Sequence, residues 1–289
     1  MTGAILIDKP AGPTSHDVVA RVRRALRIKA VGHTGTLDPF ATGLLVILTG
    51  RATRLARFVE QQFKTYVAVA RLGAATDTDD ATGTMIQSSA PASWPDAVRV
   101  ERELRGFLGR YSMRPPAYSA KKIEGARSYA RARRGESVAL AEVVVEVREI
   151  ELLEYQPPDV TFRATVSPGT YLRAIGRDLG ERLGLGAHLT GLRRTAIGDL
   201  RVDEAVPLQD LDANVPLVPL SRVLGHLAEI ALTEAEATEI GHGRTVRATQ
   251  GSTRSPVVLT REGRVVAIAD AVEDAAGPGL HPCVVLETA

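Results

Sequence analysis

The stretch Gly32-His33-Thr34-Gly35-Thr36-Leu37-Asp38-Pro39-Phe40-Ala41-Thr42-Gly43-Leu44-Leu45 decides how the rest of the chain is interpreted. It sets one carboxylate, Asp38, between a loop of glycine and threonine and an apolar run that continues to Leu48. Glycines let the backbone of another molecule approach closely. An Asp directly before Pro39 is typical of the N-cap of a helix, and an isolated Asp-Pro pair is most simply explained as such a turn.

The whole string resembles the signature of the tRNA pseudouridine synthase B family, in which the Asp of G-H-T-G-x-L-D-P is catalytic. The resemblance implies that Asp38 has this role and that His33 and Thr36 contact the RNA substrate. The string is not a phosphate-binding loop, because no Lys-Ser or Lys-Thr pair follows the glycines, and it lacks the G-x-G-x-x-G of a dinucleotide site.

Two further segments resemble motifs of the same family. Lys64-Thr65-Tyr66 resembles K-x-Y, which implies that Tyr66 stacks on the target base and acts in proton transfer. Gly169-Thr170-Tyr171-Leu172-Arg173 resembles G-T-Y-[IL]-R, which implies that Arg173 pairs with Asp38 and that Tyr171 contacts the substrate. Leu192, in a third matching stretch, would form a wall of the pocket.

A basic segment follows Arg114-Pro115-Pro116-Ala117-Tyr118-Ser119-Ala120. It interleaves cations with tyrosines, which suits phosphate neutralisation and base stacking. It also resembles the family's RNA-clasping insertion. The predicted RNA-binding residues of this segment are Lys121, Lys122, Arg127 and Arg131.

The composition is that of a globular protein of 289 residues, 44% hydrophobic and 24% charged. Cys283 is the single cysteine, which excludes an intrachain disulfide and a Cys-rich zinc site. No apolar run reaches the roughly 18 residues of a membrane helix, so we expect a cytoplasmic protein. Residues 225–289 carry five basic and nine acidic residues, so the net positive charge, where a polyanion would bind, lies in the rest of the chain.

Hydrophobic periodicity predicts alternating strands and helices. The predicted strands are 3–7, 64–72, 142–153, 159–166 and 189–197; the predicted helices begin at Ser15 as N-cap and cover 98–108 and 171–183. Thr233 and Glu236 form a capping-box pair before a small β-rich end of the chain.

These patterns indicate a mixed α/β fold. The resemblance implies the pseudouridine synthase fold, an extended mixed β-sheet with a central active-site cleft. We expect a catalytic domain over 1–228, with the RNA-clasping insertion at about 74–135, and a short, diverged PUA-like domain over 229–289.

The predicted reaction isomerises the T-loop uridine at tRNA position 55 to pseudouridine. The base must leave its stack to be turned, and the Asp38 carboxylate can attack either the ribose C1′ or the uracil C6. We expect no metal and no other cofactor, the tRNA T-arm as partner, no guide RNA or obligate protein partner, and a monomer. Two alternatives stay open: a guide-dependent synthase of ribosomal RNA, and a non-catalytic chaperone that folds tRNA.

Overall fold

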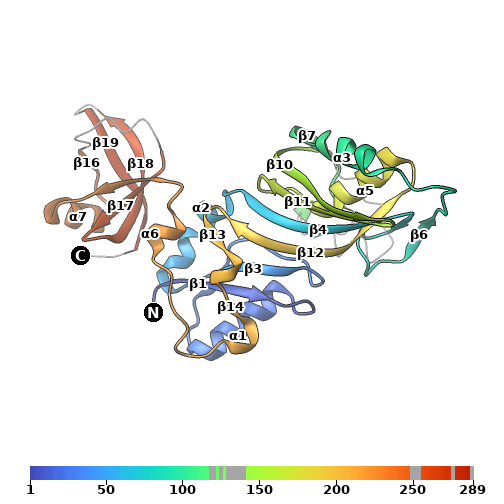
Figure 1. Cartoon of the computed structure of the whole chain (residues 1–289). Helices are drawn as coiled ribbons and strands as arrows, with labels where there is room; N and C mark the ends of the chain where they lie inside the picture. Colours follow the sequence, from blue (N-terminus) through green and yellow to red (C-terminus); the bar gives the residue numbers. More distant parts are fainter. Residues whose placement is uncertain (117–121, 124–125, 128–140, 248–254, 275–276, 287–289) are drawn as a thin grey trace. The chain divides into compact units, whose positions relative to one another are not determined.

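The computed structural model describes the chain except residues 117–121, 124–125, 128–140, 248–254, 275–276 and 287–289 (Figure 1). Contacts between residues divide it into two compact units. The first unit comprises Met1–Pro39, Leu44–Gln62 and Gly198–Ala289, and the second comprises Phe40–Gly43 and Phe63–Ile197. The chain therefore leaves the first unit twice, once briefly after Pro39 and once for most of its middle part.

The N-terminal part of the first unit is built on β1 (Gly3–Lys9), which lies between β14 (Val206–Pro207) and β3 (Thr42–Thr49). β2 (Val31–His33) pairs antiparallel with β3. The apolar run Leu44–Leu48 forms the middle of β3, and all five of its side chains are fully buried. A continuous apolar run of this kind is typical of a strand that is buried on both faces.

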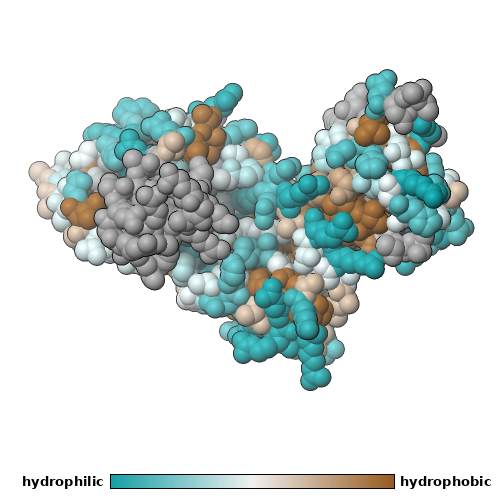
Figure 2. All heavy atoms as spheres, turned by 180° about the vertical axis from the view of Figure 1, so that it is seen from behind, coloured by the Kyte–Doolittle hydropathy of each residue, from teal (hydrophilic) through white to brown (hydrophobic). Residues whose placement is uncertain are grey.

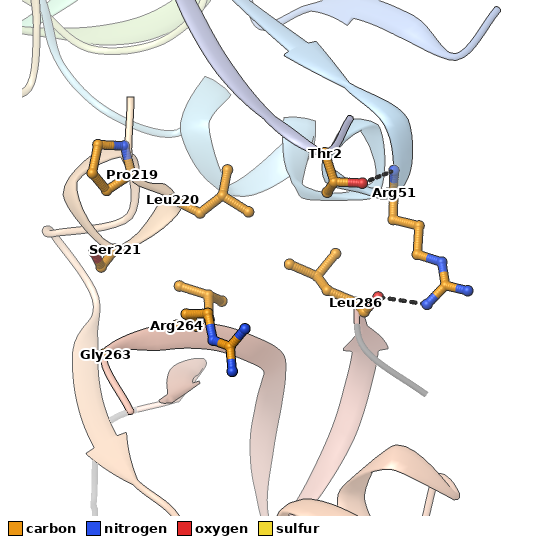
Figure 3. A pocket seen from close by; sticks show the side chains of 9 residues that line it. Thr2, Arg51, Pro219, Leu220, Ser221, Gly263, Arg264 and Leu286 are labelled. Carbon is orange, nitrogen blue, oxygen red and sulfur yellow. Dashed lines mark hydrogen bonds between the residues drawn. The ribbon is translucent and has the colours of Figure 1, made fainter. Parts of the chain in front are cut away.

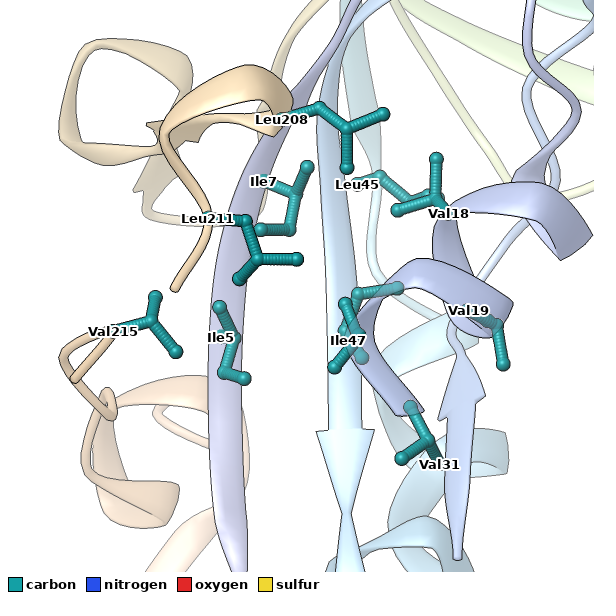
Figure 4. Packing of buried hydrophobic residues seen from close by; sticks show 11 residues of the cluster. Ile5, Ile7, Val18, Val19, Val31, Leu45, Ile47, Leu208, Leu211 and Val215 are labelled. Atoms are coloured by element: carbon teal, nitrogen blue, oxygen red, sulfur yellow. The ribbon is translucent and has the colours of Figure 1, made fainter. Parts of the chain in front are cut away.

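Helix α1 (Ser15–Leu26) packs its apolar stripe on this sheet. Ile5 and Ile7 of β1 and Leu45 and Ile47 of β3 meet Val18 of the helix in one core, shown in Figure 4. The predicted cap was wrong by one residue. Thr14 caps the helix in a capping box with Asp17, and Ser15 is its first residue.

The remaining short elements of this part of the unit link the chain around the core. They are η1 (Gly50–Leu55), α2 (Ala56–Glu60), β13 (Leu200–Arg201), η2 (Val202–Glu204), η3 (Leu208–Asp210) and α6 (Leu220–Val223).

The second unit is built on a mixed sheet in the order β12-β4-β11-β10-β7. Its strands pair antiparallel, and Thr42 and Gly43 pair in parallel with Arg193 and Arg194 of β12. This mixed sheet confirms the predicted fold class. The strands are β4 (Lys64–Leu72), β7 (Gly109–Met113), β10 (Val143–Gln156), β11 (Asp159–Val166) and β12 (Ala187–Ile197).

Helices α3 (Ala97–Arg105) and α5 (Leu172–Leu183) pack on one face of this sheet (Figure 1). Two glycines let α5 approach β12 closely. A Cβ atom on Gly176 would lie 2.7 Å from Leu189, and one on Gly180 would lie 2.3 Å from the backbone N of Ala187. β5 (Ala74–Thr76) forms a hairpin with β6 (Met85–Ser88). β8 (Lys122–Ile123) and β9 (Ala126–Arg127) form another.

The C-terminal β domain has a sheet of its own in the order β15-β17-β18-β19-β16. The predicted capping box of Thr233 and Glu236 begins α7, and Ile240 of this helix packs on Val257 and Leu259. A two-residue turn, Glu262–Gly263, joins β17 to β18 with positive φ at both residues, as in a type I′ hairpin. The elements are β15 (Ala228–Ala231), α7 (Glu234–Gly241), β16 (Val246–Arg247), β17 (Val257–Arg261), β18 (Arg264–Asp274) and β19 (Gly277–Val285).

Two arginines of η1 hold this domain within the first unit. Arg51 donates to the carbonyl of Leu286 at 2.8 Å, and Arg54 donates to the carbonyl of Val285 at 2.7 Å. A pocket of about 440 Å³ lies beside these contacts, lined by Thr2, Arg51 and Arg264 among others (Figure 3).

Within the described part of the chain, no helix is long and apolar enough to cross a membrane. Figure 2 shows hydrophilic side chains spread over the face seen from behind, with hydrophobic residues in separate areas between them. Single exposed apolar residues are normal on a protein surface.

Candidate active site

Asp38 lies in an irregular segment between β2 and β3 and is partly exposed. The Asp38-Pro39 pair, although typical of a helix start, is not followed by a helix, because Thr42 already begins strand β3. Gly43 has a φ of +105°, and a Cβ atom there would lie 2.3 Å from the carbonyl oxygen of Arg194. The close pairing of this backbone with β12 therefore overrides the local signal for a helix.

The peptide before Asp38 is held by the hydroxyl of Ser15. This hydroxyl accepts from the backbone N–H of Leu37 at 2.9 Å and donates to the Leu37 carbonyl at 3.2 Å. Ser15 is buried, so water does not compete for either hydrogen bond. The first turn of α1 thus fixes the backbone on the N-terminal side of Asp38.

The peptide after Asp38 is held by a buried lysine. The Lys9 ammonium, which is fully buried, donates to the carbonyl of Pro39 at 3.2 Å and to those of Pro10 and Pro13 at 2.9 Å each. The N–H of Gly12 donates to the same Pro39 oxygen at 2.8 Å. Lysine is almost never fully buried unless it is paired. The sequence motifs did not single out Lys9.

His33 ends β2, and its Nδ1 accepts from the N–H of Gly35 at 3.4 Å. The ring also meets His16 edge-on, with 5.5 Å between centroids. Thr36 is exposed. Both predicted RNA contacts of this segment therefore lie where solvent reaches them.

Tyr66 and Leu192 share one face of the sheet in the second unit. Tyr66 lies opposite Arg194, and Leu192 lies opposite Ala68 on the same strand as Tyr66. Side chains two residues apart on a strand point to the same face, so Tyr66 and Leu192 are diagonal neighbours. Tyr66 is 9% exposed and is one of the buried residues. This arrangement suits a flat platform with an apolar wall beside it.

Arg173, the second residue of α5, is buried with an acid that the motifs did not single out. Its Nη1 donates to the carbonyl of Thr78 at 2.9 Å and lies 3.4 Å from Oδ2 of Asp80. Both side chains are about 5% exposed. A buried charge of this kind is stable only when it is paired. The pairing of Arg173 with Asp38 stays a prediction.

Asp80 is fixed by a loop rich in threonine and aspartate. Its Oδ1 accepts from the hydroxyl of Thr78 at 2.8 Å and from the N–H and hydroxyl of Thr82 at 2.9 and 2.6 Å. The hydroxyl of Thr76 donates to the Asp80 carbonyl at 2.7 Å. The run Thr76–Thr84 was a signal for this network, because Ser, Thr and Asp side chains bind their own loop backbone.

Two other carboxyl groups near this loop have perturbed acidities. Burial raises the pKa of Asp79, and the charges of Arg177 and Arg173 oppose that rise. Burial raises the pKa of Asp178 to about 7, with contributions from the charges of Glu181 and Asp79. Perturbed groups of this kind cluster at functional sites as well as in structural ion-pair networks.

Tyr171 precedes α5 and packs in a small cluster with Met113, Val145 and Ala174. Its backbone N–H donates to the sulfur of Met113 at 3.3 Å. The residue is half-buried. Its predicted substrate contact stays a prediction, and packing is the role that its surroundings support.

The predicted RNA-binding cations of the insertion lie mostly outside the described residues. Lys121 and Arg131 are outside them altogether. For Lys122 and Arg127 the structure describes the backbone, which pairs across the β8–β9 hairpin. The role of these four side chains stays a prediction.

Comparisons with known proteins agree over almost the whole chain. Residues 23–172 match a family described as TruB family pseudouridylate synthase (N terminal domain), and residues 173–218 match the tRNA pseudouridylate synthase B C-terminal domain. A tRNA pseudouridine synthase B of Thermobifida fusca is 42% identical and covers 93% of this chain and 94% of the relative. A tRNA pseudouridine synthase B of Solibacter usitatus is 41% identical, and the match covers 99% of this chain and 100% of the relative.

Solved structures show the same fold. The crystal structure of a Cbf5-Nop10-Gar1 complex contains a chain that is 26% identical, with a TM-score of 0.77, covering 98% of this chain and 84% of that one. A chain of the archaeal box H/ACA sRNP Nop10-Cbf5 complex matches with a TM-score of 0.74 at 25% identity, and the match covers 99% of this chain and 86% of that one.

Proposed function

The chain belongs to the TruB family of pseudouridylate synthases and is a tRNA pseudouridine synthase, and we propose that it isomerises the T-loop uridine at tRNA position 55 with Asp38 as the nucleophile. One observation carries the assignment of Asp38. The carboxylate of the family string stands on a segment whose flanking peptides are both fixed, by Ser15 on one side and Lys9 on the other. A nucleophile held in place before substrate binds gains rate from orientation.

The reaction breaks the N1–C1′ bond, turns the uracil and joins C5 to C1′. C5 loses a proton and N1 gains one, so the product is an isomer and no oxidant or reductant is needed. The Asp38 carboxylate forms a covalent bond either to C1′, with uracil leaving, or to C6 of the ring. In the C1′ route, C5 of the turned uracil displaces the carboxylate from C1′ as the new bond forms; in the C6 route, the carboxylate leaves C6 after C5 and C1′ are joined.

We assign to Arg173 the role of keeping Asp38 ionised while the pocket is partly dry. A guanidinium close to a carboxylate favours its charged form. Arg173 is preorganised for such a role, because the carbonyl of Thr78 and the carboxylate of Asp80 fix its orientation.

Tyr66 offers its ring to the flipped uracil and its hydroxyl to the edge of the base, and Leu192 closes the pocket beside it. The support is their shared face of the sheet. His33 and Thr36 then contact the T loop from which the base has left. The side chains of Lys121, Lys122, Arg127 and Arg131 bind phosphates of the T-arm.

We propose that the chain has two domains. Residues 1–228 carry the chemistry, with the RNA-clasping insertion at about 74–135, and residues 229–289 form a PUA-like domain. Its separate five-stranded sheet and core support this division. Because this part of the chain is acidic, any contact with tRNA is local. We infer that the enzyme acts as a monomer in the cytoplasm, with no cofactor or guide RNA.

The test is site-resolved mapping of pseudouridine in an unmodified tRNA transcript incubated with the purified protein alone. We expect modification at position 55 with the wild type and none with Asp38→Asn, which should still bind tRNA within a few-fold. Modification only after a guide RNA is added would favour the guide-dependent alternative. Tight binding and refolding of tRNA with no modification would favour the chaperone.

A further inference from the structure

A second arginine of α5, Arg177, binds three acceptors from three parts of the second unit. Its Nη1 donates to the Asp79 carboxylate at 3.0 Å, its Nε to the Asp178 carboxylate at 2.7 Å, and its Nη2 to the carbonyl of Arg114 at 2.9 Å. Its side chain is only 18% exposed. A planar guanidinium can reach three acceptors in one plane, which a lysine ammonium cannot reproduce.

The first acceptor belongs to the loop that orients Arg173. Asp79 stands between Thr78, whose carbonyl binds Arg173, and Asp80, whose carboxylate pairs with it. Asp79 has a φ of +60°, so this turn of the backbone is tight. Its carbonyl also accepts from the N–H of Leu189 at 3.0 Å. The loop is therefore held by β12 from one side and by two arginines of α5 from the other.

The other two acceptors connect Arg177 to β7. Arg114 directly follows this strand and begins the Arg-Pro-Pro stretch that precedes the predicted RNA-binding segment. Tyr111 of the same strand donates its hydroxyl to Asp178, whose other oxygen binds Arg177. One side chain thus joins the start of that stretch to the loop around Arg173.

We propose that Arg177 is a positioning residue for pseudouridine formation, holding the Asp79 loop against α5 so that Thr78 and Asp80 fix the guanidinium of Arg173. The inference rests on the proposed function, since Arg173 matters for rate only if it serves the reacting groups. Arg177 then acts on the chemical step and not on tRNA affinity. The neighbouring charged groups, Glu181 at 3.9 Å among them, are part of the same network.

The experiment compares Arg177→Met and Arg177→Lys with Arg182→Met as a matched control. Arg182 lies on the same helix, stacks over Phe107 at 3.7 Å and donates to the Glu103 carbonyl, so its loss removes packing away from the Asp79 loop. The readouts are the single-turnover rate at saturating tRNA and the tRNA dissociation constant.

Misplacement of a catalytic group by about 1 Å can cost about 100-fold in rate. We expect Arg177→Met to lower the saturating rate by about 10- to 100-fold, with the dissociation constant within about threefold. Arg177→Lys should recover part of the rate, and Arg182→Met should keep it within about threefold even where it lowers the melting temperature. A normal rate in Arg177→Met, or a loss matched by Arg182→Met, would overturn the proposal. So would weaker binding at an unchanged saturating rate.

A double-mutant cycle separates positioning from general loss of structure. Asp79→Asn keeps the shape of the side chain but removes its charge. We expect Asp79→Asn to slow the reaction and the double variant with Arg177→Met to be no slower than Arg177→Met alone. Effects that multiply would show that the two residues act independently and would overturn the proposal. If Arg177→Met does not fold, Arg177→Lys and Asp79→Asn test the same coupling. A wild type that forms no pseudouridine refutes the proposed function instead.

Discussion

Replacing Gly43 with Ala should destabilise the protein far more than replacing Gly12 with Ala. The two glycines have nearly the same φ, +105° and +108°, a region that residues with a side chain rarely adopt. They differ in their surroundings. A Cβ atom at Gly43 would lie 2.3 Å from the carbonyl oxygen of Arg194 and 2.8 Å from its N, whereas nothing lies within 4 Å of a Cβ atom at Gly12.

The backbone strain common to both variants is about 1–3 kcal/mol. Gly43→Ala adds an overlap with backbone, which can be relieved only by moving Thr42 and Gly43 away from β12, and forced overpacking costs about 1–3 kcal/mol more. The sum is about 2–6 kcal/mol for Gly43→Ala, against about 1–3 kcal/mol for Gly12→Ala. Urea unfolding followed by circular dichroism measures both. Equal losses in the two variants would refute the reasoning, because they would mean that the close approach to β12 contributes nothing.

Four further results follow from the structure and the proposed function. Asp38→Asn should abolish turnover, because an amide is a very poor nucleophile; residual turnover above about one per cent of wild type would remove Asp38 from that role. Tyr66→Phe should keep tRNA binding and lose most of the reaction rate. Full activity in Tyr66→Phe together with an inactive Tyr66→Leu would instead mean that Tyr66 acts only by stacking on the base. The pKa of Asp178 is raised from 3.8 to about 7, so the folded protein holds the proton of this carboxyl group more tightly than the unfolded chain does. The contribution of Asp178 to the free energy of unfolding therefore falls as the pH rises between these two values. Asp178→Asn should therefore gain stability relative to wild type as the pH rises from about 4 to about 7, and a constant difference would contradict this. Neutralising the four cations of the insertion should flatten the salt dependence of tRNA binding, by somewhat under one unit of slope for each lost phosphate contact; an unchanged slope would place them away from the RNA. These cations are Lys121, Lys122, Arg127 and Arg131.

The strands were the most predictable part of the fold, because their pattern is local. Asp159–Val166 alternates apolar and polar residues, Lys64–Leu72 is rich in apolar residues, and both predicted ranges are the observed strands. The capping box of Thr233 and Glu236 was equally clear, since both of its hydrogen bonds lie within four residues. Where residues close in sequence decide the structure, the sequence alone is sufficient.

The helix-start pattern of Asp38-Pro39 shows the limit of such local signals, because no helix follows it. The N-cap signal is real but local, and the conformation of Gly43 is decided by Arg194, far along the chain. The cap of the first helix shows how small such errors can be. Thr14 and Ser15 are both good N-cap residues, and the neighbour that separates them is Leu37, which engages the Ser15 hydroxyl.

In the candidate site, too, some residues could be predicted from local sequence and others could not. Reaction chemistry demands particular residue types, so short strings that resemble family motifs were enough to predict roles for Asp38, Tyr66 and Arg173. The groups that hold them only need to donate or accept hydrogen bonds, and many residue types can do that. Lys9 lies 30 residues from its acceptor Pro39, and Thr78 lies 95 residues from Arg173. No local pattern links such pairs.

Helix α5 shows what a pattern can still reveal once the fold is known. Its sequence repeats Arg-x-x-Gly in Arg173-Ala174-Ile175-Gly176 and again in Arg177-Asp178-Leu179-Gly180. The two glycines bring the helix against β12, where any side chain would collide with Leu189 or Ala187. The two arginines are one turn apart, so they project on the same side and reach the same loop. The close packing and the paired arginines therefore depend on each other. The arginines reach Thr78 and Asp79 because the glycines keep the helix at this short distance from the sheet.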